Sequence, residues 1–455
     1  MSALPVPGPP PPEPTPLAPA PEPPRVSVAR SAVGILASTV VTLAIGYVAS
    51  VFLARALGPA GRGQIAVMQA DIALIVSFAG LGTPAAITFF ASRRARHQPS
   101  LNGFALIFTA LLGAASLVGV LFFGGFLAEH QGRGFDHRLW WLVGLFVPLM
   151  YAEYYVSALL NARHQYRLSN RLNVLGRVAT LVFTLSLVTG LRWGVAGGLI
   201  ATAMISAVKV IGSLPTLKAI GARLPSRNLI GATFNYGWRV CVGQMFRFFS
   251  GRFDVLVLSW LAPLATVGTY SIAQMVAELV IIIPQSFGFV VLPMVAAGED
   301  HRAAPALRLV GTLALLGVIG MAFAGPALII VGFGEAFRNA LVPFFILLPG
   351  IWMLAFGNIC SFVLGGKKRP GSSSLLAGAA AVLTVILDFA LIPPFGAIGG
   401  AIASTAAYTL FGVASLVLVA RIFDTAPWRL LLVTFGEARG YWKMAAMRLA
   451  IARHE

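Results

Sequence analysis

The chain has 455 residues, of which 58% are hydrophobic and only 11% are charged, and its formal net charge is +18. The apolar residues lie in long blocks that do not alternate with polar ones, which excludes a soluble globular protein and a membrane β-barrel. In a soluble protein this charge would suggest nucleic-acid binding. The positions of the basic residues along the chain decide whether nucleic acid or the membrane explains the charge.

The chain begins with a proline-rich tail, residues 1–30. Twelve prolines fall between Met1 and Pro24, and such a segment cannot bury a hydrophobic core, so we expect a disordered cytoplasmic tail. Twelve apolar blocks follow, each long enough to cross a bilayer core about 30 Å thick as a helix. The predicted spans are 31–54, 64–90, 101–127, 139–160, 174–191, 194–217, 230–261, 266–297, 305–332, 338–365, 373–393 and 396–423.

Basic residues predict the orientation of these spans. If the N-terminus lies inside, 24 of the 33 Lys and Arg fall on the inner side, almost all of them expected between helices. The positive-inside rule then places both termini in the cytoplasm, and anionic lipid head groups account for the charge without nucleic acid. Cys241 and Cys360 fall inside predicted spans and the six histidines are scattered, so no metal site is indicated.

Two pairs of short stretches indicate an internal repeat. "GVAGGLIAT" from Gly194 matches "GAIGGAIAS" from Gly396, 202 positions later, and "GRGQIAVMQAD" from Gly61 aligns with "GTYSIAQMVAE" from Gly268, 207 positions later. We therefore predict an all-α membrane protein of two six-helix lobes, related as a tandem parallel repeat around a central cavity, which favours transport. The predicted divisions are the N-terminal lobe 31–217, a cytoplasmic linker 218–229, the C-terminal lobe 230–423 and a basic cytoplasmic segment 424–455.

Three stretches carry a family resemblance: "LARALGPAGRGQIA" from Leu53, "RFDVLVLSWLAPLATVGTYSIA" from Arg252 with "VLPM" at Val291, and "LIPPFGAIGGAIAST" from Leu391. In order and spacing they resemble the Wzx-type oligosaccharide flippases of the polysaccharide transporter family. These belong to the superfamily of multidrug, oligosaccharidyl-lipid and polysaccharide (MOP) exporters. The resemblance implies a multi-pass protein of the bacterial inner membrane that moves a polyprenyl-diphosphate-linked glycan by alternating access. Glycan polymerase and glycosyltransferases are the implied partners.

The predicted span 230–261 carries three arginines and one aspartate, although a charge at a helix centre costs about 2.5 to 3.5 kcal/mol. Arg239, Arg247 and Asp254 fall within an arc of about 80°, so we expect them to face the cavity, while Arg252 points elsewhere. Arg239 and Arg247 are candidates for binding the diphosphate, whose oxygens match a guanidinium. The alternative is a salt-bridge network in which Asp254 or Glu278 holds an arginine in place.

Further charged candidates lie outside that span. Arg55 and Arg62 flank the outer end of the first hairpin, where they either bind the diphosphate or extend to the membrane interface. The offset of 207 aligns Asp71 with Glu278. Each of these acids either carries a proton or sodium ion during transport or neutralises arginines across the cavity.

Two single acids, Glu153 and Asp388, lie in the fourth and eleventh predicted spans. For both we expect local hydrogen bonding.

Other functions fit the sequence less well. A cation-coupled drug exporter of the same superfamily favours an acidic or neutral cavity, and lipid II flippases typically carry fourteen helices. A membrane glycosyltransferase or polymerase needs acidic residues in aqueous loops, and the loops predicted here are short. A scaffold for a synthesis complex is a further alternative. We expect no cofactor beyond a coupling proton or sodium ion.

Overall fold

A computed structural model describes residues 28–93, 97–130, 139–296, 298, 300–367, 369–434 and 436–437. Within these residues every regular element is a helix, which confirms the predicted all-α fold class. The proline-rich tail lies almost wholly outside the described residues, and so does most of the segment 424–455.

The N-terminal part of the chain forms α1 (Val28–Ala79), α2 (Thr83–Arg93), α3 (Gln98–His130), α4 (Trp140–Ala162), α5 (Tyr166–Phe183), η3 (Thr184–Gly190), α6 (Gly194–Gly212) and α7 (Leu214–Ile220). The C-terminal part forms α8 (Arg227–Leu261), α9 (Leu264–Glu278), η4 (Leu279–Ile281), α10 (Ile282–Ala296), α11 (Asp300–Ala327), η5 (Leu328–Phe333), η6 (Glu335–Ala340), α12 (Leu341–Gly366), α13 (Pro370–Phe395), α14 (Ala397–Ile422) and η7 (Pro427–Leu430).

All twelve predicted spans fall on these helices. Among the described residues, ten helical stretches are long and apolar enough to cross a membrane. One of them, 39–79, holds most of the first two predicted spans. Between these spans the backbone adopts φ 67° at Gly58, and Pro59 starts a second arm. The charged helix α8 is not among the ten, although its 35 residues are long enough to cross.

The second span, 64–90, was predicted as one continuous helix, and this was wrong. The chain turns at residues 80–82 between α1 and α2, with Leu81 and Gly82 at positive φ. The freed carbonyl of Gly80 accepts hydrogen bonds from the hydroxyls of Thr83 (2.7 Å) and Tyr151 (3.0 Å). A helix break is tolerated at membrane depth because side-chain hydroxyls satisfy the backbone in this way.

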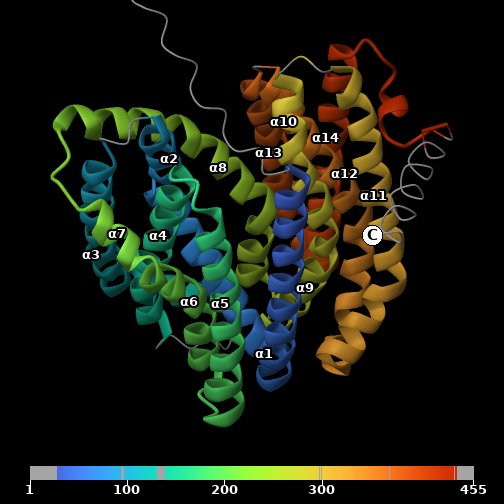
Figure 1. Cartoon of the computed structure of the whole chain (residues 1–455). Coiled ribbons are helices and arrows are strands. Elements are labelled where there is room, and N and C mark those ends of the chain that lie inside the picture. Colours follow the sequence, from blue (N-terminus) through green and yellow to red (C-terminus); the bar gives the residue numbers. More distant parts are fainter. Residues whose placement is uncertain are drawn as a thin grey trace, which may run out of the picture.

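The helices form two groups that diverge toward one end of the molecule (Figure 1), with α2 to α7 on one side and α10 to α14 on the other. Helix α8 contacts both groups. Near its start, Tyr236 stacks on Phe89 of α2 with ring centroids 4.5 Å apart, and near its end Trp260 stacks on Phe389 of α13 at 6.5 Å. The start of α8 therefore packs on the N-terminal helices. The cytoplasmic linker between the lobes at 218–229 stays a prediction.

The two groups touch where the second arm of α1 meets α9. A Cβ on Gly63 would lie 1.9 Å from the carbonyl oxygen of Leu264, and a Cβ on Gly268 would lie 1.9 Å from that of Pro59. This reciprocal contact relates Pro59 to Leu264 and Gly63 to Gly268, both 205 positions apart. The helices are thus equivalent at an offset of 205, and the predicted offset of 207 was wrong. Val276, not Glu278, is the counterpart of Asp71.

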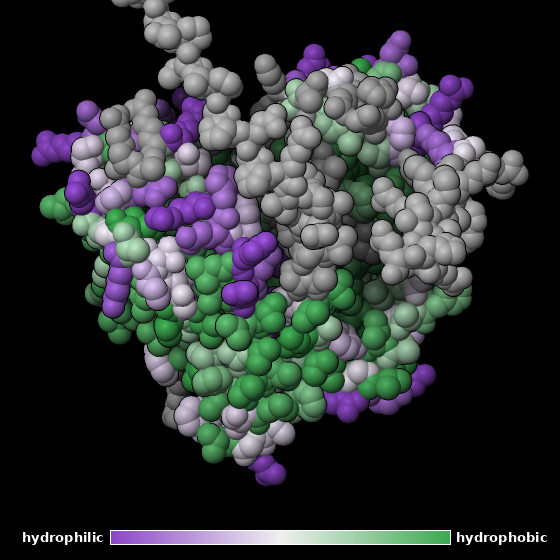
Figure 2. Space-filling view, in the orientation of Figure 1, coloured by the Kyte–Doolittle hydropathy of each residue, from purple (hydrophilic) through white to green (hydrophobic). Residues whose placement is uncertain are grey.

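Figure 2 shows apolar residues across the middle and lower part of one face, with hydrophilic residues gathered above them and at the lower edge. This distribution fits a protein that lies in a bilayer. Several basic residues lie within helices and not between them. Arg177, for example, lies within α5, and Lys209, 6% exposed, lies within α6.

Candidate functional site

Charged side chains gather beside the glycine contact between the two groups of helices. Arg62, next to Gly63 on α1, is 9% exposed, and its Nε has no hydrogen-bond partner among the described residues. Arg252 of α8 donates to the side-chain oxygen of Gln274 (3.0 Å) and pairs with Glu278 at 3.3 Å, both on α9. The charges of Arg62 and Arg252 interact. We call Arg62, Arg252, Gln274 and Glu278 the interface cluster.

The cluster revises two predictions for these residues. Arg252 was expected to point away from the cavity charges, but it is the arginine that Glu278 holds. Glu278 therefore neutralises an arginine, as one of the two predicted alternatives had it. Arg62 is buried at the contact and does not extend to the membrane interface.

Asp254 was predicted to face the cavity, but this was wrong. It is buried inside the C-terminal helices, at 1% exposure. It accepts hydrogen bonds from the hydroxyls of Tyr270 and Ser404, the latter at 3.0 Å, and from the backbone N–H of Val255 at 2.7 Å. The amide of Gln274 donates to Asp254 at 3.5 Å, so Gln274 connects this network to Arg252.

A second acid, Asp388 of α13, lies near this network. It is fully buried, and neither carboxylate oxygen has a hydrogen-bond partner among the described residues, so the predicted local hydrogen bonding was wrong. Its charge interacts with that of Asp254. Two interacting buried carboxyls cannot both be ionised at low cost, so we expect one of them to be protonated or to bind a cation.

The other sequence candidates lie apart from the cluster. Arg239 is exposed near the middle of α8, and the side chain of Arg247 is outside what the structure describes. Asp71 is buried on α1, at 8% exposure. No group of three or more His, Cys, Asp or Glu that could hold a metal ion occurs within the described ranges.

Arg55 contacts backbone carbonyls instead of an open cavity. Its Nε donates to the carbonyl of Gly332 (2.7 Å) and its Nη2 to that of Val331 (2.5 Å), while the hydroxyl of Tyr47 donates to Leu328 (2.7 Å). These acceptors lie in η5, a π-helical turn. The bonds join α1 to α11–η5 and fasten the two groups of helices together near Gly58.

We predict that Arg55→Gln weakens this fastening without unfolding the protein. Hydrogen bonds to a charged group contribute about 1.5 to 3 kcal/mol, and the freed carbonyls lie at an exposed side chain where water can replace the guanidinium. Accessibility of a cysteine at Ile329, a fully buried residue of the same turn, to a water-soluble maleimide should rise several-fold. Arg192→Gln, in the exposed turn before α6, is the matched control; equal labelling in both variants would contradict the fastening role.

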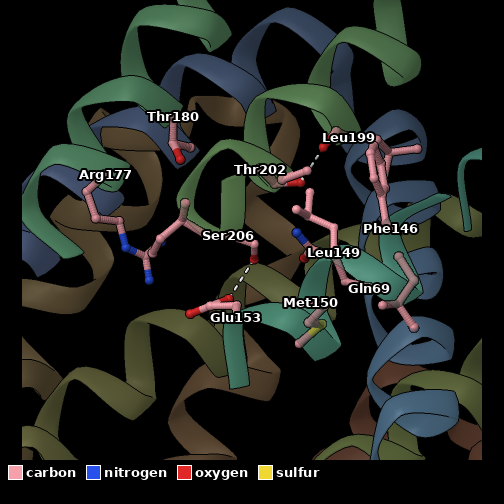
Figure 3. Close-up of a pocket in the computed structure, with 13 residues that line it drawn as sticks. Gln69, Phe146, Leu149, Met150, Glu153, Arg177, Thr180, Leu199, Thr202 and Ser206 are labelled. Carbon is pink, nitrogen blue, oxygen red and sulfur yellow. Dashed lines mark hydrogen bonds between the residues drawn. The ribbon is translucent and has the colours of Figure 1, made fainter. Parts of the chain in front are cut away.

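A separate pocket of about 270 Å³ lies within the N-terminal helices, between α1, α4, α5 and α6 (Figure 3). Glu153 accepts a hydrogen bond from Ser206 at 2.6 Å and pairs with Lys209 at 3.6 Å, which confirms its predicted local bonding. Arg177 lines the same pocket. Arg177 lies inside the predicted span 174–191, but sequence reasoning did not select it as a site residue.

Comparison with solved structures finds the same fold in two kinds of transport protein. An inward-facing multidrug resistance MATE family transporter of the MOP superfamily matches with a TM-score of 0.72 and 16% identity, over 84% of this chain and 94% of that one. The lipid II flippase MurJ in an inward closed conformation matches with a TM-score of 0.71 and 14% identity, over 88% and 89%. At such identities the likeness concerns the fold alone.

Sequence comparison gives the family. An uncharacterized membrane protein of Methanocaldococcus jannaschii is 27% identical over 201 residues, and the chain spans about two fifths (39%) of that relative's length. The model of a family described as polysaccharide biosynthesis protein matches residues 28–298, more than half of the chain. The chain is therefore a multi-pass helical protein that belongs to the polysaccharide biosynthesis protein family.

Proposed function

We propose that the protein is a flippase that moves a polyprenyl-diphosphate-linked oligosaccharide across the bacterial inner membrane for surface polysaccharide biosynthesis. The observation that carries the proposal is Arg62, a buried guanidinium at the contact between the helix groups whose Nε has no hydrogen-bond partner within the described part of the chain. A buried N–H group without an acceptor is costly, and an oxygen of a substrate anion would supply one.

The charge of the interface cluster supports an anionic substrate. Arg62 and Arg252 contribute two positive charges and Glu278 one negative charge, which leaves the four residues of the cluster at +1. Asp254, which Gln274 connects to the cluster, already accepts hydrogen bonds from Tyr270 and Ser404. A diphosphate offers oxygens to both guanidinium groups, each of which can bind in a bidentate manner. A cationic drug would meet repulsion at the same place.

The arrangement of the helices supports alternating access. The groups meet near Gly63 and at the Arg55 fastening, and they diverge toward the other end (Figure 1). With both termini in the cytoplasm, as the positive-inside rule predicts, the glycine contact lies at the outer side. The substrate would then enter from the cytoplasm, where glycosyltransferases assemble it, and be released outward to a polymerase.

The experiment is transport by the full-length protein in liposomes. We expect a fluorescent polyprenyl-diphosphate disaccharide to cross at a rate that depends on the protein, and ethidium, an aromatic cation, to remain on its original side. Transport of ethidium without movement of the diphosphate lipid would replace this proposal with drug export.

We also propose that Asp388 and Asp254 bind the coupling cation, a proton or a sodium ion. Asp388→Asn keeps the size of the side chain but removes one of the two interacting charges. We expect the variant to reach normal membrane levels and to transport at a rate that no longer depends on the proton or sodium gradient. Asp424→Asn, in the turn after α14, is the control. Unchanged gradient dependence in Asp388→Asn would rule out the assignment.

A further inference from the structure

The pocket within the N-terminal helices is lined by one cation, Arg177, and one acid, Glu153. The acid already has two other partners, of which Lys209 lies beside the pocket. Glu153 pairs with Lys209 and accepts from Ser206. The Nε of Arg177 is buried and has no hydrogen-bond partner among the described residues.

The guanidinium of Arg177 packs against α1 and also lines the pocket. A Cβ built on Gly46 of α1 would lie 3.5 Å from Nη1 of Arg177, so this contact is with a glycine, which offers no side chain to pair with the charge. Figure 3 shows Arg177 and Glu153 extending toward the same part of the pocket, with Thr180, Thr202 and Gln69 around it. Their attraction keeps the two groups near each other, but Lys209 already pairs with the carboxylate.

We propose that this pocket binds a small amphiphilic oxyanion, a carboxylate or a phosphate monoester with a short hydrocarbon chain. The anion would form a bidentate pair with Arg177, and the hydrocarbon would lie against Phe146, Leu149 and Met150. A volume of about 270 Å³ exceeds the roughly 150 Å³ cavity that accepts benzene but is too small for a polyprenyl-linked glycan. The ligand is therefore distinct from the proposed transport substrate, and the site does not depend on that proposal.

The test measures thermal unfolding of the full-length protein in a neutral maltoside detergent with hexanoate, hexyl phosphate or hexanol. A ligand that binds only the folded state raises the unfolding temperature. We expect one or both anions to raise it and hexanol to leave it unchanged; the anion with the larger effect identifies the head group. Equal effects of hexanol and the anions, or no effect of either anion, would overturn the proposal.

Charge variants locate the site. Arg177→Gln should weaken anion binding at least about tenfold, whereas Glu153→Gln, which raises the net charge of the pocket, should strengthen it. Arg171→Gln, exposed on the same helix, and Arg62→Gln, in the interface cluster, should bind as the parent does. If Arg177→Gln does not fold, Ala203→Leu fills the pocket while all charges remain and should also abolish the effect. Binding that survives in Arg177→Gln or Ala203→Leu, or that is lost in Arg62→Gln, would contradict the assignment.

Discussion

Arg62→Gln is expected to reduce flipping of a polyprenyl-diphosphate glycan by about 10- to 100-fold, because a hydrogen bond from a charged donor contributes about 1.5 to 3 kcal/mol. Membrane levels of the variant should hold or rise, since the substitution removes a buried charge whose Nε has no hydrogen-bond partner among the described residues. Arg62→Lys should retain part of the activity, because an ammonium keeps the charge but lacks the bidentate geometry. Flipping in liposomes, normalised to reconstituted protein, measures both.

Two controls separate binding from folding. Arg192→Gln removes an exposed arginine before α6 and should transport normally. Arg252→Gln removes a half-exposed partner of Glu278, so it should lose activity with little change in stability, and Glu278→Gln in the same chain should not restore transport. Full activity in Arg62→Gln would contradict the proposed binding of the diphosphate by the interface cluster.

Gly63→Val is expected to prevent closure of the helix groups at their contact. A Cβ at this position would lie 1.9 Å from the carbonyl oxygen of Leu264, so α1 and α9 must separate by at least about 1.1 Å to reach the 3.0 Å that real Cβ contacts require (3.0 minus 1.9). Overpacking of this kind costs about 1 to 3 kcal/mol. The state described here should therefore be depopulated, and flipping should fall by more than about tenfold.

Spin labels on cysteines at Ala60 and Ala265, both exposed, report the separation of the two helices. The native Cys241 and Cys360 are buried and should not be labelled. In Gly63→Val the distance distribution should move to longer values. Gly119→Val is the matched control, because a Cβ on Gly119 of α3 has no atom within 4 Å. A distribution identical to that of the parent chain would show that the glycine contact does not control closure.

The helical framework was predictable from the sequence because each span is a long apolar block. Such a block is recognised even when the predicted first and last residues of the span are wrong by several positions. The predicted fifth span began at residue 174, whereas α5 begins at Tyr166, because the polar face of its first turns hid the helix. The break at residues 80–82 escaped prediction because it depends on hydroxyls of Tyr151 and Thr83, which are far apart in the sequence.

The site was harder to predict because helix phase fixes only the side of a helix that a residue occupies. Arg239 and Asp254 share a face of α8, yet one is exposed and the other is enclosed by Tyr270 and Ser404. The pairing of Arg252 with Glu278 depends on how α8 and α9 pack together. The register of the repeat was off by two residues because a few matched Gly and Ala positions do not fix an alignment in a chain rich in both.

The most direct test of the account is the binding of polyprenyl diphosphate and of polyprenol, its neutral analogue, to the purified full-length protein, measured by native mass spectrometry. We predict that the parent chain binds the diphosphate at least about tenfold more tightly than the alcohol, and that the difference disappears in Arg62→Gln/Arg252→Gln. If the double variant retained the same preference for the diphosphate, the interface cluster would not be its binding site.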